Sequence, residues 1–325
     1  MKVLFQIAIV CMAACLAVPA FAQDTPCQMK DDVDAATKSS LDNAAAQYLG
    51  NLASGNTAAL AAAATPEFGN ITALANEAKG NLTGATGKVR WYFILDNTQG
   101  KPGQRAEFYC GVFNSNDRIS FSFPQLPPAR FGVVVQDTTG GKVPYMITWI
   151  LQNVNSTWRI AGMIPKPTTI AGKSGLDYWK EARAAKTAAK QHTAYFDYVM
   201  ADYLLRPTTL MTTNNLDKLA DEMQAAMPND LPVNGPITLQ AANGKGYQVT
   251  QVFPTPVDDK LDLVVKYTVP DVSNTTQAFQ DNTAVIKSVV TKWPEVRDSF
   301  NAIVARATAP NGQDYGTLLE MKDIK

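Results

Sequence analysis

The spacing of the apolar residues changes in the first half of the chain from a helical period to a strand period, and this change restricts the fold class. Over residues 32–53 apolar side chains recur every three or four positions, and shorter helices are expected over residues 57–64 and 71–79. Six aromatic and β-branched segments follow with a period of 2, at residues 89–95, 106–113, 119–123, 131–136, 145–151 and 158–164. This order predicts an α+β unit in which N-terminal helices pack on an antiparallel sheet.

The second half of the chain predicts a helical region and then a small α+β module. Residues 165–175 are expected to form a linker, and Ser174 with Asp177 is a capping-box signature for the helix that follows. Helical spacing extends to Met227, so residues 174–228 are predicted to be a helical hairpin region. Beyond a proline-rich linker, residues 236–325 predict four strands and one helix, at 247–253, 261–268, 300–307 and 315–321 and at 275–292.

The first residues have the pattern of a secretory signal. Lys2 precedes an apolar run from Val3 to Val18, and the small residues before Gln23 favour cleavage near Ala22/Gln23. Residues 1–22 are therefore predicted to be a signal peptide, and the protein is expected to be periplasmic or secreted. Lipid attachment at Cys15 is an alternative, because the residues before it loosely resemble a bacterial lipobox.

Removal of that signal would leave Cys27 and Cys110 as the only two cysteines. Two cysteines in an oxidising compartment most simply pair, so the sequence predicts a disulfide that ties the N-terminus to the strand carrying Cys110. A reactive thiol is the alternative, but it needs a neighbouring base or a helix N-terminus, and the residues around Cys110 supply neither.

The order of elements and several short motifs resemble a known fold family. Tyr48-Leu49, Ser54-Gly55-Asn56-Thr57-Ala58-Ala59-Leu60, Thr65-Pro66-Glu67-Phe68 and Trp158-Arg159-Ile160-Ala161-Gly162 are similar to the nuclear transport factor 2-like family. The resemblance covers about residues 30–165. It implies a curved sheet wrapped around a long helix, a cone that often leaves an apolar pocket for small ligands, for catalysis or for protein contacts. The proline-rich residues 124–128 depart from the pattern and leave a β-sandwich open as an alternative for part of the region.

The helical region resembles a single tetratricopeptide-type hairpin through Ala182, Ala194, Tyr198, Ala201 and Pro207. It departs from that family at Glu181, where a leucine is usual, and Pro207 comes one residue late. Because a solenoid needs about three stacked repeats, one copy predicts a spacer rather than a peptide-binding groove. The C-terminal module resembles no family that we recognise.

Composition excludes several classes of function. The 29 Lys and Arg residues balance 29 Asp and Glu residues, which argues against a nucleic-acid-binding protein. The single histidine, His192, rules out centres with several histidine ligands, and we expect it to cap a helix C-terminus. Residues 167–174 end like a phosphate-binding loop, but Pro167 stands where that loop needs glycine, so we predict a capped helix entrance. No metal or other cofactor is predicted.

The aromatic residues of the sheet are the candidate binding residues. Alternation places Trp91, Phe93 and Leu95 on one face of a strand, and the candidates for a pocket in the cone are Trp91, Phe93, Phe108 and Trp149. Plain core packing beneath the helix is the alternative for all four. Catalytic members of the resembling family use an acid with a tyrosine, and the residues available for this are Tyr92, Asp96, Glu107 and Tyr109.

The sequence therefore favours a non-enzymatic binding or interaction protein of the cell envelope. Its partner would be a hydrophobic small molecule or an envelope protein. The alternative is a pocket enzyme of the isomerase or hydrolase type that uses an acid and a tyrosine in the cone domain.

Overall fold

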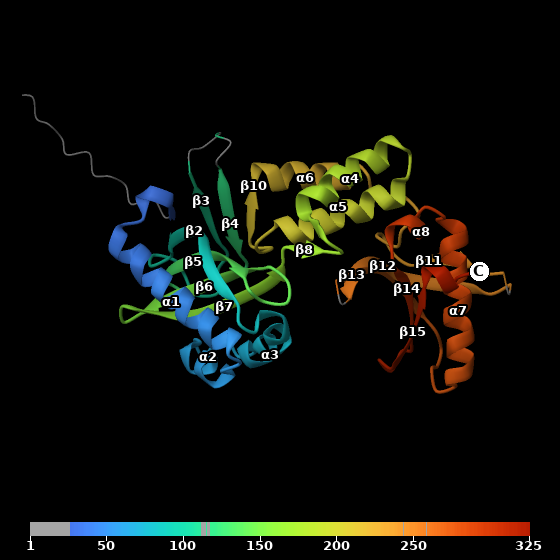
Figure 1. Ribbon diagram of the computed structural model, residues 1–325, viewed down its shortest axis with the longest axis horizontal. Helices are drawn as coiled ribbons and strands as arrows, with labels where there is room; N and C mark the ends of the chain where they lie inside the picture. Colours follow the sequence, from blue (N-terminus) through green and yellow to red (C-terminus); the bar gives the residue numbers. More distant parts are fainter. Residues whose placement is uncertain (1–26, 112–114, 116–117, 243, 258) are drawn as a thin grey trace, which may run out of the picture.

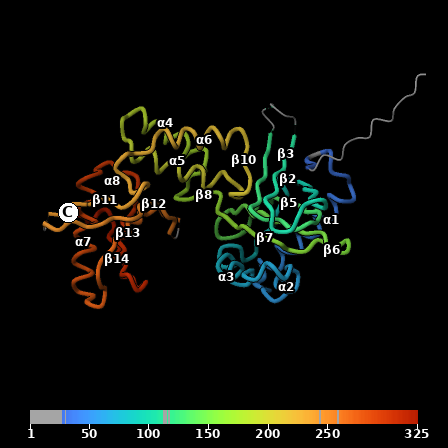
Figure 2. Tube along the Cα trace, turned by 180° about the vertical axis from the view of Figure 1, so that it is seen from behind, coloured from blue at the N-terminus to red at the C-terminus, as the bar shows by residue number. Residues whose placement is uncertain are grey.

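The computed structural model describes residues 27–111, 115, 118–242, 244–257 and 259–325, so the expected signal peptide lies outside the described residues. The described chain is an α+β fold, as the sequence predicts. Figure 1 shows an N-terminal unit and a C-terminal module at opposite ends of the long axis, with a helical region between them, and the view from behind in Figure 2 agrees. None of the helices in the described ranges is long and apolar enough to cross a membrane.

A five-stranded antiparallel sheet forms the centre of the N-terminal unit. Its strands lie in the order β1 (Cys27–Met29), β2 (Thr86–Asp96), β5 (Arg130–Thr139), β6 (Tyr145–Val154) and β7 (Thr157–Pro167). The turn between β6 and β7 is made by Asn155 and Ser156, whose φ angles are 49° and 63°, as a tight two-residue hairpin requires. Since β7 lies at the edge of the sheet, it tolerates Pro165 and Pro167, which cannot donate a ladder hydrogen bond.

Three helices cover one face of this sheet: α1 (Ala35–Ala53), α2 (Thr57–Ala63) and α3 (Ile71–Leu82) (Figure 1). Asp34 caps α1 by accepting a hydrogen bond from the first turn. The packing is close at Gly132 on β5, where a Cβ atom would collide with the side chain of Leu41 on α1. Tyr48 on α1 lies 5.8 Å from the fully buried Trp149 between ring centroids. This face holds one of the cores of the N-terminal unit.

A three-stranded sheet covers the opposite face, in the order β10 (Met211–Thr213), β4 (Ile119–Phe123) and β3 (Ala106–Cys110). A disulfide joins Cys27 on β1 to Cys110 on β3, with 5.3 Å between the Cα atoms, and this confirms the predicted pairing. Phe93 and Phe121 pack edge to face between the sheets, 5.0 Å apart. Because β10 comes from the helical region, that region completes a layer of the N-terminal unit and is more than a spacer.

The helical region begins with a hairpin where the sequence predicts a linker. Its elements are β8 (Thr169–Ile170), β9 (Lys173–Ser174), α4 (Gly175–Thr187), α5 (Gln191–Leu205) and α6 (Asn214–Gln224). Ala171 and Gly172 form the turn between β8 and β9 with φ angles of 51° and 70°. Ser174 and Asp177 form the predicted capping box. At Gly175 a Cβ atom would collide with Leu205, so glycine allows the close approach of α4 and α5.

The C-terminal module is a five-stranded sheet with one long helix on one face. Its elements are β11 (Ile237–Gln240), β12 (Gly246–Val257), β13 (Lys260–Thr268), α7 (Thr275–Lys292), α8 (Val296–Ser299), β14 (Ala302–Thr308) and β15 (Asp314–Glu320). The pair β13 and β14 is parallel, and α7 makes the crossover between them. Phe196 on α5 packs edge to face on Phe300, 5.6 Å away, so the helical region and this module share one core.

The sequence predicts the long elements well and the short ones poorly. The helix expected over residues 275–292 is α7 with the same bounds, and the helices expected near 32–53 and 71–79 are α1 and α3. The strands β1, β10 and β11 have three or four residues each, too few for a period of 2 to be recognised. The cone fold expected from the family resemblance stays a prediction.

Candidate functional site

A cleft of about 590 Å³ lies between the N-terminal unit, the helical region and the C-terminal module. It is lined by α3, by the turn between β5 and β6, by the end of β7, by β8, by Tyr203 on α5, and by Pro256 and Asp259 of the C-terminal module. Its volume lies within the range of small-molecule sites, about 300–1,000 Å³. Ligand sites often form where separate units meet, and this cleft is our candidate functional site.

One wall of the cleft is a face of α3 held against the β5–β6 turn. Leu74, Glu77 and Asn81 recur at helical spacing and line this wall. The backbone N–H of Lys142 donates to the Asn81 carbonyl at 2.8 Å. A Cβ atom at Gly141 would collide with that same carbonyl oxygen, so only glycine permits the turn to approach the end of α3 so closely.

The opposite wall is fixed by a contact between Lys166 on β7 and Tyr203 on α5. The Lys166 Nζ atom lies 4.5 Å from the centroid of the Tyr203 ring, within the range of a cation–π interaction. Lys166 also donates to the backbone carbonyl of Arg206 at 2.9 Å, which anchors its ammonium group. Burial lowers the pKa of Lys166 to about 8, although the nearby Asp202 carboxylate opposes this shift. The ring of Tyr203 is thereby held at the edge of the five-stranded sheet.

The C-terminal module reaches the cleft through Asp259. Its carboxylate accepts a hydrogen bond of 3.0 Å from the backbone N–H of Ala171, in the turn between β8 and β9. Tyr178 on α4 holds the same hairpin, because its hydroxyl donates to the Ile170 carbonyl at 3.2 Å. These two contacts connect the third wall of the cleft to the helical region.

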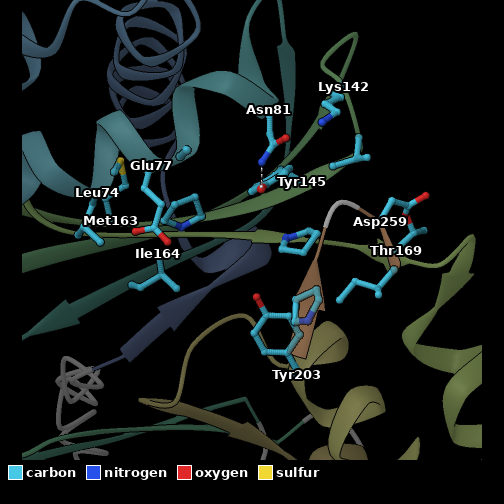
Figure 3. Close-up of a pocket in the computed structure, with 16 residues that line it drawn as sticks. Leu74, Glu77, Asn81, Lys142, Tyr145, Met163, Ile164, Thr169, Tyr203 and Asp259 are labelled. Carbon is cyan, nitrogen blue, oxygen red and sulfur yellow. Dashed lines mark hydrogen bonds between the residues drawn. The ribbon is translucent and has the colours of Figure 1, made fainter. Parts of the chain in front are cut away.

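Two tyrosine hydroxyls give the cleft its hydrogen-bonding character. Asn81 Nδ2 donates to the Tyr145 hydroxyl at 2.8 Å, which leaves the Tyr145 proton for another acceptor (Figure 3). Burial raises the pKa of Tyr145, with Asn81 opposing and Glu77 adding to the shift. Burial also raises the pKa of Tyr203, and Tyr145 and Glu77 add to it. Both phenols therefore stay protonated at neutral pH and act as hydrogen-bond donors.

The charged groups lie at the two ends of the cleft. Glu77 lies at one end beside Met163 and Ile164, and Lys142 and Asp259 lie at the other (Figure 3). Pro165 and Pro167 of β7 and Ile170 of β8 add apolar surface to the lining. The cleft thus offers an apolar floor, two phenol donors, the Glu77 carboxylate at one end, and the Lys142 ammonium with the Asp259 carboxylate at the other.

The structure does not gather the four predicted binding residues in one pocket. Phe93 and Phe108 are buried in the core between the two sheets, whereas Trp149 is buried in the core under the helices. Trp149 also donates from Nε1 to the Gln136 side chain at 3.0 Å, so its polar atom is satisfied. Trp91 alone lines a cavity, a groove of about 300 Å³ that it shares with Trp179 and Met211.

None of the predicted acid and tyrosine candidates lines the cleft. Tyr92 donates to Asp42 on α1, and Asp96 accepts a hydrogen bond from Thr98 N at 2.9 Å. Tyr109 donates to Glu107 at 3.2 Å on the exposed face of strand β3. Of the acids and tyrosines of the N-terminal unit, Glu77 and Tyr145 line the cleft.

The sequence predicts that His192 caps a helix C-terminus, and this prediction is wrong. It lies in the first turn of α5, and its Nδ1 and Nε2 atoms are 2.8 Å from Glu295 and 2.7 Å from Asp230. Both ring nitrogens are occupied by carboxylates, so the ring has no free nitrogen to act as a base. In the described part of the chain, no group of three or more His, Cys, Asp or Glu side chains is arranged to hold a metal ion.

Sequence reasoning missed the cleft because its walls come from distant segments. Tyr145 falls in the strand expected over residues 145–151 and Tyr203 in the helical region 174–228, and neither pattern marks a site. The one available signal was Pro165-Lys166-Pro167. Two prolines directly after a strand pattern mark an edge strand as well as a linker, and the structure shows the edge strand.

Comparison of the chain with protein-family models, with curated protein sequences and with solved structures finds no match.

Proposed function

We propose that the protein is a non-enzymatic binding protein that acts outside the cytoplasm and holds a small amphipathic molecule in the cleft between its units. The observation that carries this proposal is the construction of the cleft. All three parts of the chain contribute to its walls, and the contacts of Lys166 with Tyr203 and of Asp259 with Ala171 hold those walls in place. A preorganised site of this kind loses little free energy to ordering when a ligand binds.

The lining defines the chemistry of the ligand. Met163, Ile164 and Pro165 provide an apolar floor for an apolar body. Tyr145 supplies a hydroxyl proton for an oxygen acceptor, and Glu77 supplies a carboxylate for a donor. The ligand we propose therefore has an apolar middle, a hydrogen-bond donor at one end and oxygen acceptors along its length.

The compartment rests on the disulfide. A structural disulfide between Cys27 and Cys110 fits a protein of an oxidising compartment. The proposal also includes export by a signal peptide with cleavage near Gln23 and a periplasmic or secreted destination. It further includes a cone fold of the nuclear transport factor 2-like kind for residues 30–165. Helices packed on one face of an antiparallel sheet support the last of these.

The proposal is tested by native mass spectrometry of the protein purified from its own envelope fraction. We expect an adduct of one small molecule per chain, which the Glu77→Gln variant loses or binds at least ten-fold more weakly. Glu67→Gln is the matched control, since Glu67 is also exposed but does not line the cleft. A bare chain under gentle ionisation, with no ligand that protects it from thermal unfolding, would refute the proposal.

A second candidate function is favoured by the presence of Glu77 and Tyr145 in one cleft. A carboxylate as general base and a neutral phenol as hydrogen-bond donor are the groups that an isomerase or hydrolase of the predicted type needs. The two functions differ in the fate of the bound molecule. A ligand recovered chemically unchanged supports binding. A product that forms with the parent protein, but with neither Glu77→Gln nor Tyr145→Phe, supports the enzyme.

A further inference from the structure

A second pocket lies between the helical region and α8 of the C-terminal module and shares no lining residue with the cleft. It has a volume of about 350 Å³ and lies between α4, α5, α8 and the strand β9. Its lining includes the carboxylates of Glu181, Asp197 and Asp298. Acidic side chains together are common on protein surfaces, so the state of each carboxylate decides whether this pocket is a site.

Asp197 is buried without a partner. Only 7% of the residue is exposed, and no hydrogen bond or ion pair from the described residues reaches its side chain. Burial raises the pKa of Asp197 to about 7, with Glu181 adding to the shift and Lys173 opposing it. A largely buried carboxylate with no protein hydrogen bond lowers the stability of a fold, because the charge loses most of its water and gains no protein partner in return.

The other polar groups that face Asp197 in the pocket are already paired. Lys173 on β9 lies 2.7 Å from Glu181 on α4. Lys190, before α5, lies 3.2 Å from Asp298 on α8. The remaining lining groups are also satisfied: the Tyr178 hydroxyl donates to a backbone carbonyl, and the Thr193 and Ser299 hydroxyls bond to each other. Among the polar side chains of the described lining, Asp197 alone therefore has no hydrogen bond or ion pair.

The lining selects among possible ligands. A divalent metal ion is disfavoured, since no group of three ligating side chains in the described ranges is arranged to hold one. Small anions are disfavoured because the unpaired group is a carboxylate. The apolar part of the lining is formed by Ala184 and Ala185 of α4 and by Ala188, which follows that helix. A ligand that fits both features carries N–H donors on a positive charge and a short apolar chain.

We propose that this pocket binds a small organic ammonium ion whose N–H groups donate to Asp197. The ammonium supplies the partner that the carboxylate lacks, and the alkyl chain lies against the alanines of α4. Binding requires the ionised carboxylate, so affinity depends on pH. The charged groups Lys173, Glu181, Lys190 and Asp298 and the phenol of Tyr178 also face the pocket, and the paired lysines and carboxylates nearly cancel each other's charge.

The test is calorimetric titration of the full chain with propylammonium chloride at several pH values. We expect one site per chain, with an affinity that falls about 100-fold between pH 8 and pH 5 as the Asp197 carboxylate becomes protonated. Tetramethylammonium has the same charge but no N–H group, and it is expected to bind at least ten-fold more weakly. Asp197→Asn should lose binding, whereas Asp221→Asn, which removes an exposed carboxylate on α6, should retain it.

A second readout separates loss of binding from damage to the fold. In carboxyl carbon NMR spectra of the parent protein, saturating propylammonium should lower the pKa of Asp197, because the bound cation favours the charged form. The proposal is overturned if Asp197→Asn binds as tightly as the parent, or if tetramethylammonium binds equally well. Calcium binding in place of the amine, or no amine binding at millimolar concentration at pH 8, would overturn it too.

Discussion

The Nε2 atom of His192 lies 2.7 Å from Oδ1 of Asp230, and this contact joins the helical region to the segment that leads into the C-terminal module. The same imidazole stacks on the Trp293 ring, 4.8 Å away, and Trp293 Nε1 donates to the other oxygen of Asp230 at 2.8 Å. Glu295 lies at the second ring nitrogen, so the single histidine of the chain connects the helical region to the C-terminal module.

Asp230→Asn is expected to destabilise the protein by about 1–2 kcal/mol at neutral pH, because two charge-assisted hydrogen bonds weaken. Burial alone raises the pKa of Asp230, but hydrogen bonds from Trp293 and His192 outweigh it and hold the pKa below its usual range. A lowered carboxyl pKa stabilises the fold above the unfolded-state pKa, and the effect is lost as pH falls through the folded-state value. Urea unfolding at pH 7, 5 and 3 should show the difference between variant and parent shrinking with acidity. A stability difference between variant and parent that grows as pH falls would contradict the stabilising role of the Asp230 carboxylate.

Removal of the disulfide should loosen the N-terminus. The bridge spans 83 positions of sequence, for which the loop-entropy model gives a stabilisation of about 4–5 kcal/mol as an upper figure. The double variant Cys27→Ala, Cys110→Ala should therefore unfold at a lower urea concentration, and hydrogen exchange should be fastest in β1 and its partner strand. A reductant should destabilise the parent and leave the double variant unchanged. Equal stability of the reduced and oxidised parent would exclude a structural role.

Trp149 and Trp91 should differ sharply in their effect on stability. Trp149 is fully buried, so Trp149→Ala should cost about 3–5 kcal/mol and leave the Gln136 amide without its partner. Trp91 is only partly buried and lines a groove, so Trp91→Ala should cost less than half as much. Thermal and urea unfolding of both variants measure this. Equal costs would mean that the groove beside Trp91 closes in solution and that both tryptophans serve as core.

The sequence predicted what depends on period and on local chemistry. The spacing of Leu41, Ala45, Tyr48 and Leu52 predicts the buried face of α1, and the Ser174–Asp177 capping box predicts the start of α4. The pairing of β10 with β4 depends on tertiary contacts between segments that are far apart in the chain, and no local pattern carries it. The cleft has the same origin, because Glu77, Tyr145 and Tyr203 are ordinary residues of their elements until the units pack together.

Asp197→Asn should stabilise the protein above pH 7. The folded-state pKa of about 7 lies above the usual value of 3.8, so the neutral acid at low pH costs the fold nothing, and the ionised form destabilises the fold progressively as pH rises from about 4 to 7. The gain from asparagine should grow between pH 4 and pH 7 and then level off, with a limit on the order of 4 kcal/mol. Thermal unfolding of parent and variant from pH 4 to pH 8.5 measures the gain, with Asp221→Asn as control. A variant less stable than the parent at pH 8 would mean that Asp197 has a structural partner in solution.

Lys166→Met should change stability in a direction that depends on pH. Burial lowers the pKa of Lys166 to about 8 from 10.5, so the charged ammonium is unfavourable in the fold below pH 8, and the penalty is relieved as pH rises from 8 to 10.5. Relative to the parent, the methionine variant should therefore be most stable near pH 7 and lose that advantage by pH 10. Lys180→Met, at an exposed position on α4, should show no such trend.

Because the Lys166 ammonium also holds the Tyr203 ring, the Lys166→Met variant should bind the cleft ligand more weakly than the parent at pH 7, even though the variant is more stable there. Unchanged ligand affinity together with a flat pH profile would show that Lys166 is solvated and does not fix this wall.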